Sequence, residues 1–120
     1  MPDKINKHTT GIRGQKAAEA FLIQTGHEIV TRNYRIRTGE IDLIAKADDY
    51  IIFVEVKFRT NTNFGLPREA VNFAKQQKIT RTAMHYISKY KLDNHNFRFD
   101  VVEVLEQDGK LYANHIKDAF

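Results

Sequence analysis

A short acidic turn between two strand-like segments constrains the fold more than any other feature of this sequence. Residues 40–45 largely alternate between acidic and apolar side chains, residues 51–56 are dense in β-branched side chains, and Asp48-Asp49 lies between the two segments. Such alternation and composition are typical of strands, and a two-residue connection is typical of an antiparallel hairpin. The sequence therefore predicts a β-hairpin that turns at Asp48-Asp49.

The segments around this hairpin complete an alternating α/β pattern. Apolar residues at helical spacing predict a helix over residues 13–25, which Gly26 ends. Strand-forming composition predicts three more strands, over residues 29–36, 97–105 and 110–116. With a second helix between the hairpin and the last two strands, the order is α-β-β-β-α-β-β, which predicts an α/β sandwich with a mixed sheet.

The second helix is expected to begin near Pro67 and to continue to about Tyr90, because proline suits the first turn of a helix. Its apolar stripe consists of Ile79, Ala83, Tyr86, Ile87 and Tyr90. A neighbouring basic edge, at three- and four-residue steps, consists of Lys75, Lys78, Thr82, His85 and Lys89. We expect the stripe to face the core and the basic edge to face solvent or phosphate.

The length of 120 residues suits one domain, which we place at residues 11–120 after a flexible arm at residues 1–10. The composition, 42% hydrophobic and 28% charged, is that of a folded domain. The longest apolar run, residues 50–54, is far shorter than the roughly 20 residues of a bilayer span. Residues 1–14 contain no apolar region of a secretory signal, so we expect a cytoplasmic protein with no membrane partner.

The residue types exclude several classes of site. The sequence has no cysteine, which leaves oxygen and imidazole as metal ligands. The histidines include no pair spaced three or four residues apart, and no glycine-rich phosphate loop is present. A bound metal is therefore expected to be a hard cation, and nucleotide hydrolysis is not expected.

The hairpin places acidic residues opposite one another. With Asp48-Asp49 as a two-residue turn, Asp42 faces Glu55 and Glu40 faces Lys57 on one face of the sheet. The other face then holds Ile41, Leu43, Val54 and Val56. Directly opposed residues have Cβ atoms about 4.5 to 5.5 Å apart, so Asp42 and Glu55 are within reach of one cation. Mg²⁺ commonly takes one or two carboxylates together with water and phosphate oxygens.

Lys57 shares this face and could steady a nucleophilic water or a phosphate oxygen. An acid-x-Lys triplet is common by chance, since a second one occurs at residues 108–110. The alternative interpretation is a solvated hairpin face on which Glu40 and Lys57 form an ordinary cross-strand ion pair. The residues alone leave both interpretations open.

Several motifs in the same order resemble those of the YraN family of bacterial proteins. These motifs are Arg32-Asn33-Tyr34-Arg35, residues 39–45, Phe53-Val54-Glu55-Val56-Lys57 with Arg59, Phe64-Gly65, and Arg98-Phe99-Asp100-Val101. The resemblance covers the chain from about Gly11 to the C-terminus. That family is similar to Holliday-junction resolvases of the PD-(D/E)XK nuclease superfamily. The resemblance implies a restriction-endonuclease-like fold, Asp42 as the motif aspartate, Glu55 and Lys57 as the E-x-K element, and a divalent metal.

Two positions depart from the family pattern. Ile41 precedes Asp42 where the superfamily name has proline, and Gln15 follows Gly14 where relatives usually have glutamate. Glu19 lies four residues further on, on roughly the same helix face, and is the candidate replacement. A solvated position on the helix is the commoner meaning of such a glutamate.

Basic residues and the acidic hairpin together favour a nucleic-acid partner. Lysine and arginine outnumber aspartate and glutamate by 19 to 15, for a net charge of +4. The candidate phosphate contacts are Arg32, Arg35, Arg37 and Arg59, with Lys75 and Lys78 on the second helix.

We therefore expect a DNA endonuclease in which Asp42 and Glu55 hold Mg²⁺ or Mn²⁺ and Lys57 stabilises the transition state. Branched or structured DNA is the expected substrate. Cutting two strands requires paired active sites, which a homodimer would supply. The alternative is a non-catalytic nucleic-acid-binding or scaffold protein on the same fold, an interpretation that Gln15 keeps open.

Overall fold

The computed structural model describes residues 7–59 and 71–120. Its elements are α1 (Lys7–Gln24), β1 (Glu28–Ile36), β2 (Gly39–Ala47), β3 (Tyr50–Arg59), α2 (Phe73–Lys89), β4 (Asn96–Gln107) and β5 (Lys110–Ile116). The predicted order α-β-β-β-α-β-β is confirmed. No helix in these ranges is long and apolar enough to cross a membrane.

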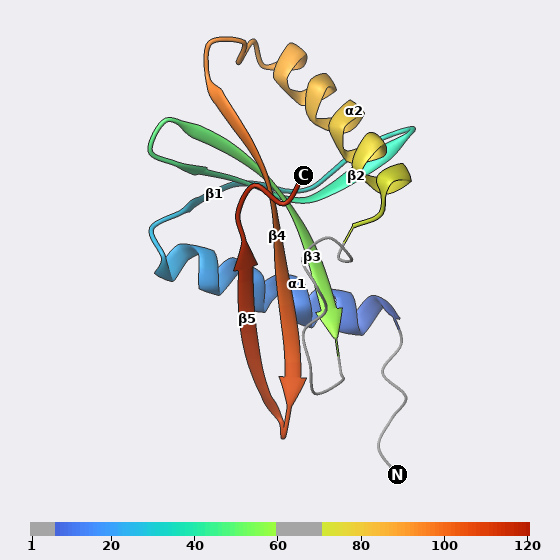
Figure 1. Ribbon diagram of the computed structural model, residues 1–120, viewed down its shortest axis with the longest axis vertical. Coiled ribbons are helices and arrows are strands. Elements are labelled where there is room, and N and C mark those ends of the chain that lie inside the picture. Colours follow the sequence, from blue (N-terminus) through green and yellow to red (C-terminus); the bar gives the residue numbers. More distant parts are fainter. Residues whose placement is uncertain (1–6, 60–70) are drawn as a thin grey trace.

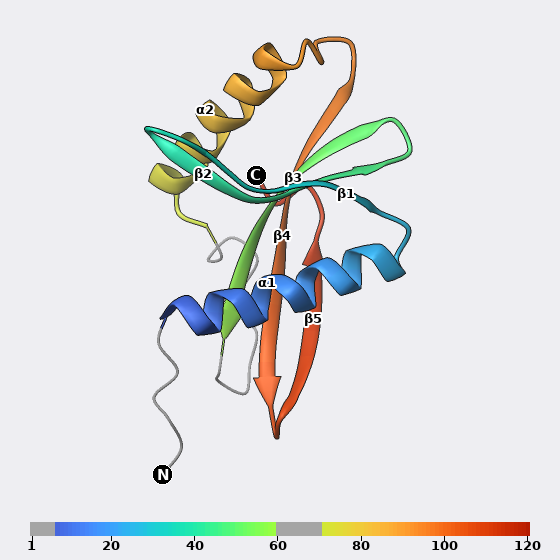
Figure 2. The same cartoon turned by 180° about the vertical axis from the view of Figure 1, so that it is seen from behind.

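The five strands form one mixed sheet in the order β1-β2-β3-β4-β5. Strands β3 and β4 are parallel and are connected through α2, whereas the other neighbouring pairs are antiparallel. Figures 1 and 2 show α2 on one face of the sheet and α1 crossing the opposite face. This is the α/β sandwich with a mixed sheet that the sequence predicts, and it is consistent with a restriction-endonuclease-like fold.

Each face of the sheet has its own apolar core. The cluster beneath α2 includes Phe53 and Val101 of the sheet together with Ile79 and Tyr86 of the helix. The cluster beneath α1 includes Leu22 of the helix and, on the strands, Leu43, Ala45, Ile52, Val54, Val102 and Val104. Because the central strands β3 and β4 are covered on both faces, their sequences are nearly continuous apolar runs.

Both helices begin at residues other than those predicted. Helix α1 begins at Lys7 instead of Arg13, because the apolar spacing that located it starts only at Ala17, so the end of the predicted arm is helical. Residues 1–6 of that arm lie outside the described residues, as does Pro67. Helix α2 begins at Phe73, after Asn72, whose side chain accepts a hydrogen bond from the N–H of Lys75.

The predicted apolar stripe of α2 is confirmed at four of its five positions. Ile79, Ala83, Tyr86 and Ile87 are buried, but Tyr90 is the C-terminal cap residue and is 51% exposed. Thr82, predicted on the basic edge, is instead fully buried. It packs against the start of β2, where Gly39 presents no side chain.

The predicted register of the hairpin is confirmed from Ala47↔Tyr50 to Leu43↔Val54, where the pairing of β2 with β3 ends. Before that point β2 runs with β1 past α2 and separates from β3 (Figure 1). The prediction that Ile41 shares a face with Leu43 is wrong, since Ile41 belongs to the core beneath α2. The strict alternation used for that prediction holds only where the two strands remain paired.

Glycines allow both helices to approach the sheet closely. A Cβ atom on Gly39 would overlap Thr82 Oγ1 and lie 3.1 Å from the backbone oxygen of Lys78. A Cβ atom on Gly14 of α1 would lie 2.8 Å from Cδ2 of Phe58 in β3. Gly39 therefore fixes how closely the first half of α2 lies to β2, which determines where the lysines of that helix reach.

Candidate metal centre

Asp42 lies where β2 separates from β3. Its Oδ2 accepts a hydrogen bond of 2.8 Å from the backbone N–H of Val56, which is one position beyond Glu55 on β3. The side chain of Asp42 thus spans the gap between the strands and satisfies a donor that the ended ladder leaves without a β2 carbonyl. This bond fixes the carboxylate beside the last paired residues.

Glu55 converges on Asp42 from the opposing strand. Both side chains line one pocket, and Glu55 is only 6% exposed. Burial raises the pKa of Asp42 to about 7, and the negative charge of Glu55 adds to the effect, while the N–H of Val56 and the charge of Lys75 act in the opposite direction. The negative charges of Asp42 and Glu55 therefore repel each other.

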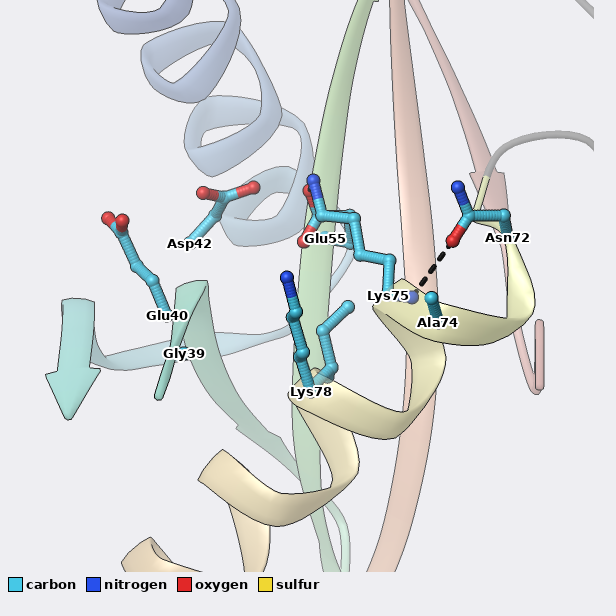
Figure 3. A pocket seen from close by; sticks show the side chains of 9 residues that line it. Gly39, Glu40, Asp42, Glu55, Asn72, Ala74, Lys75 and Lys78 are labelled. Carbon is cyan, nitrogen blue, oxygen red and sulfur yellow. Dashed lines mark hydrogen bonds and ion pairs between the residues drawn. The ribbon is translucent and has the colours of Figure 1, made fainter. Parts of the chain in front are cut away.

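The first turns of α2 form the opposite wall of the pocket. Lys75 Nζ lies 2.8 Å from Glu55 Oε1, and Lys78 lines the pocket one turn further along (Figure 3). Asn72 Oδ1 accepts a hydrogen bond of 2.9 Å from the N–H of Lys75 and so fixes the start of the helix. The pocket encloses about 450 Å³ and combines acidic residues from β2 and β3 with lysines from α2.

The lining of this pocket is Gly39, Glu40, Asp42, Glu55, Asn72, Ala74, Lys75, Lys78 and Ile79. Lys57 is not among these residues, although it lies two positions beyond Glu55 and is therefore on the same side of β3. The cross-strand ion pair of Glu40 with Lys57, which the alternative interpretation predicts, is not formed, because β2 and β3 no longer pair at these residues. Glu40 Oε2 instead lies 3.0 Å from a guanidinium nitrogen of Arg35 on β1.

Three of the four candidate arginines form ion pairs within the protein. Arg32 pairs with Glu19, Arg35 pairs with Glu40, and Arg59 Nε donates a hydrogen bond of 2.8 Å to the fully buried Glu103. Arg37 is exposed in the connection between β1 and β2. Arg32 and Arg35 are themselves 53% and 72% exposed, so their guanidinium groups remain accessible to an external phosphate.

The first-helix candidates are not brought into the pocket. Glu19 pairs with Arg32, and neither Glu19 nor Gln15 lines the pocket. Within residues 7–59 and 71–120, no group of three or more His, Asp or Glu side chains is arranged to hold a metal ion. Among the residues that the structure describes, a metal here would have two carboxylate ligands, Asp42 and Glu55.

Two carboxylates fit a hard divalent ion that completes its shell with water and substrate oxygens. Mg²⁺ is usually held in this way, by one or two carboxylates and substrate phosphates, and Mn²⁺ accepts the same oxygen ligands. Asp42 has no ion-pair partner among the described residues, whereas Glu55 is paired with Lys75. The donor set therefore fits Mg²⁺ or Mn²⁺.

Sequence reasoning missed Gly39 and Asn72 as residues that shape the site. Asn72 accepts from the N–H of Lys75, three residues further on, which is the pattern of an N-cap. The prediction instead placed the start of the helix near Pro67, because proline suits a first turn. Gly39 acts through contact with Thr82, which lies 43 positions away. No local signal reveals a contact of this kind.

Comparison with known proteins identifies close relatives. The family model described as "Uncharacterised protein family UPF0102" matches residues 14–104. A UPF0102 protein of Clostridium acetobutylicum is 49% identical over 119 residues, which cover 98% of this chain and 97% of the relative. UPF0102 proteins of Caldanaerobacter subterraneus and Clostridioides difficile are each 47% identical, over 120 and 116 residues. The similarity extends along nearly the whole chain in all three.

Proposed function

The chain belongs to the UPF0102 family, and we propose that it is a metal-dependent nuclease that hydrolyses phosphodiester bonds in DNA. One observation carries the proposal. Asp42 and Glu55 converge from two separating strands into a pocket whose opposite wall holds Lys75 and Lys78. Such a pocket combines the ligands of a hard cation with groups that attract phosphate.

Asp42 and Glu55 are the proposed ligands of Mg²⁺ or Mn²⁺. A bound divalent ion supplies an activated water and neutralises charge on a phosphoryl oxygen. Lys57, on the same side of β3 as Glu55, is proposed to stabilise the additional charge of the transition state. The N–H of Val56 holds Asp42 in place for this task, which limits the rearrangement needed when the ion binds.

DNA is the proposed polyanion because basic side chains surround the pocket. Arg35, which pairs with Glu40 at the rim, and the exposed Arg37 belong to the adjoining edge of the sheet. Surface ion pairs such as Arg35 with Glu40 are worth little, so a DNA phosphate can replace the carboxylate. Following the resemblance to Holliday-junction resolvases, we propose branched DNA as the substrate, a homodimer as the active assembly and the cytoplasm as the location.

A cleavage assay tests this function. Linear, flapped and four-way DNA are incubated with the protein in EDTA, Mg²⁺ or Mn²⁺, and Glu55→Gln serves as the variant that removes one ligand charge at constant size. We expect metal-dependent cleavage by the parent and a loss of at least about 100-fold in the variant. Metal-dependent cleavage that Glu55→Gln retains at full rate would contradict the assignment of the pocket.

A second candidate function is binding of nucleic acid without cleavage. It is favoured by Gln15, which stands where the resemblance leads one to expect a glutamate, and by Glu19 being paired with Arg32 away from the pocket. On this alternative the protein binds branched DNA in EDTA as well as in Mg²⁺ and cleaves none of the substrates. Measuring binding beside cleavage on the same DNA distinguishes the two functions.

A further inference from the structure

The ion pair between Lys75 and Glu55 joins a buried anion to a cation that reaches solvent. The side chain of Glu55 is 6% exposed, whereas that of Lys75 is 45% exposed, and their charged atoms lie 2.8 Å apart. A buried carboxylate without a partner would be costly, so the ammonium group stabilises Glu55. The exposed side of Lys75 means that the ammonium can leave Glu55 without crossing packed protein.

The backbone of Lys75 is held independently of its side chain. Its N–H donates to Asn72 Oδ1, and Gly39 allows the adjacent turn of α2 to lie against β2. The four-carbon stem can therefore redirect the ammonium group while the helix stays in place. Release of Glu55 requires a change in side-chain rotamers only, and the ammonium remains at the mouth of the pocket.

The carboxylates of the pocket attract a cation both in the metal-free protein and when a divalent metal is bound. Lys75 Nζ contacts Glu55 Oε1, and Asp42 and Glu40 line the same pocket, so more than one carboxylate stabilises the ammonium group of Lys75. A divalent ion bound between Asp42 and Glu55 would neutralise the same carboxylates and repel the ammonium from contact distance.

We propose that Lys75 is an exchangeable counter-ion: it neutralises Glu55 in the metal-free protein, is displaced when a divalent metal binds, and then contacts a backbone phosphate of the substrate. This inference rests on the proposed metal site. It makes Lys75 a substrate-positioning residue whose availability depends on the metal, and it couples the binding of metal to the binding of DNA. Lys78 has the same charge in the same pocket but no ion pair to either carboxylate, so it is the matched control.

Binding of Mn²⁺ to the DNA-free protein tests the exchange. Isothermal titration is performed on the parent, Lys75→Met and Lys78→Met, each shown by its thermal melt to be folded. Removing either lysine strengthens metal binding through the general loss of positive charge, but only Lys75→Met also removes a direct competitor. We expect about tenfold tighter binding of Mn²⁺ for Lys75→Met and less than about threefold for Lys78→Met.

The outcomes separate this inference from the proposed function. Equal changes in the two variants, with Mn²⁺ bound by all three proteins, would overturn the exchange and leave the metal site intact. Absence of Mn²⁺ binding in the parent and both variants would overturn the metal site and, with it, the exchange.

A second measurement follows the parent protein, with Lys75→Arg used only for assignment, and does not depend on whether Lys75→Met folds. In ¹⁵N-labelled protein, the lysine ammonium that is hydrogen-bonded to Glu55 should give a protected NMR signal in EDTA, assigned by its absence in Lys75→Arg. We expect this signal to disappear at saturating Mg²⁺. Its persistence at saturation would show that metal and Lys75 do not compete, and would overturn the proposal.

Discussion

The carboxylate of Asp42 accepts a hydrogen bond of 2.8 Å from the backbone N–H of Val56, across the point where β2 and β3 cease to pair. A side chain thus replaces the backbone carbonyl that a continuous ladder would provide. This relationship holds one acidic residue beside another, because Val56 directly follows Glu55. The geometry of the candidate site is therefore a consequence of where the hairpin ladder ends.

The pH dependence of stability should report the burial of the Asp42 carboxylate and its repulsion by Glu55. The pKa of Asp42 is raised by burial and by Glu55 to about 7, so the folded state retains a proton that the unfolded chain releases near pH 4. Stability in EDTA should therefore fall as pH rises from about 4 to about 7 and stay lowered above that. Asp42→Asn removes this effect and can still accept the bond from Val56, so it should stabilise the protein at pH 8 but not at pH 4.

The size of this effect has an upper limit. A rise of the Asp42 pKa from its ordinary value to about 7 corresponds to at most roughly 4 kcal/mol, which solvent screening and relaxation reduce to about 1 to 2 kcal/mol, or several degrees in melting temperature. Asp49→Asn, an exposed change in the turn of the same hairpin, is the control. Melts across pH 4 to 8 that show equal stabilities for parent and Asp42→Asn would contradict the convergence of the two carboxylates.

Gly39→Ala should separate α2 from β2. The added Cβ would overlap Thr82 Oγ1, and the backbone oxygen of Lys78 limits how far the strand can yield, so we expect a loss of about 1 to 3 kcal/mol in denaturant unfolding. Gly11→Ala is the matched control, since it lies in α1 with open space around it and should stabilise by up to about 1 kcal/mol.

The same contact predicts a coupling that a non-specific effect of alanine would not produce. Thr82→Ala removes the overlapping atom, so the double variant with Gly39→Ala should be more stable than the sum of the two single changes indicates. Strictly additive free energies of unfolding would show that Gly39 does not set the distance to α2.

Asp100 is expected to be structural despite its place in a family motif. Its buried carboxylate accepts two hydrogen bonds of 2.8 Å from Arg98, and His115 Nε2 lies 2.7 Å from Oδ2. Burial alone would raise the pKa of Asp100, but these partners and the N–H of Asp118 outweigh it and lower the pKa. The stabilisation is therefore present above the ordinary pKa of aspartate and is lost as pH falls through the lowered folded-state pKa.

Asp100→Asn should consequently destabilise the protein by roughly 3 kcal/mol at pH 7 while leaving the affinity for Mn²⁺ within about twofold. Chemical denaturation and isothermal titration measure the two quantities. A variant with unchanged stability and weakened metal binding would assign Asp100 to the metal centre instead.

DNA binding in EDTA should depend steeply on salt. Each neutralised phosphate contributes about 0.9 to the slope of log affinity against log salt, so Arg37→Ala should lower the slope by about 1. Lys46→Ala, at the opposite end of β2, is the control and should leave the slope unchanged. A flat salt response of the parent would count against both nucleic-acid functions.

The order of helices and strands along the chain and the hairpin register could be predicted because they depend on local patterns. A two-residue turn at Asp48-Asp49 determines which residues oppose each other, and β-branched runs identify the strands. The same reasoning correctly paired Leu43 with Val54. It misplaced Ile41, because the twist that separates β2 from β3 depends on the packing of β2 with β1 and α2.

The partners of the charged residues could not be predicted, because they come from distant parts of the chain. Arg59 meets Glu103 across parallel strands, and Lys75 meets Glu55 only because α2 returns over the sheet. The sequence identified Lys75 as basic and exposed, which is correct. Its contact with a buried carboxylate emerges only from the crossover of α2.

The response of thermal stability to a divalent metal shows most directly whether Asp42 and Glu55 form a metal site. Parent, Asp42→Asn and Asp49→Asn are melted at pH 8 in EDTA and in millimolar Mg²⁺ or Mn²⁺. If Asp42 and Glu55 form this site, metal at tenfold over its Kd should stabilise the parent and Asp49→Asn by about 1.4 kcal/mol, whereas Asp42→Asn should melt at a higher temperature than the parent in EDTA and show no change with metal. The metal site would be contradicted if the parent melts at the same temperature with and without either metal and Asp42→Asn changes the free energy of unfolding by less than about 0.5 kcal/mol.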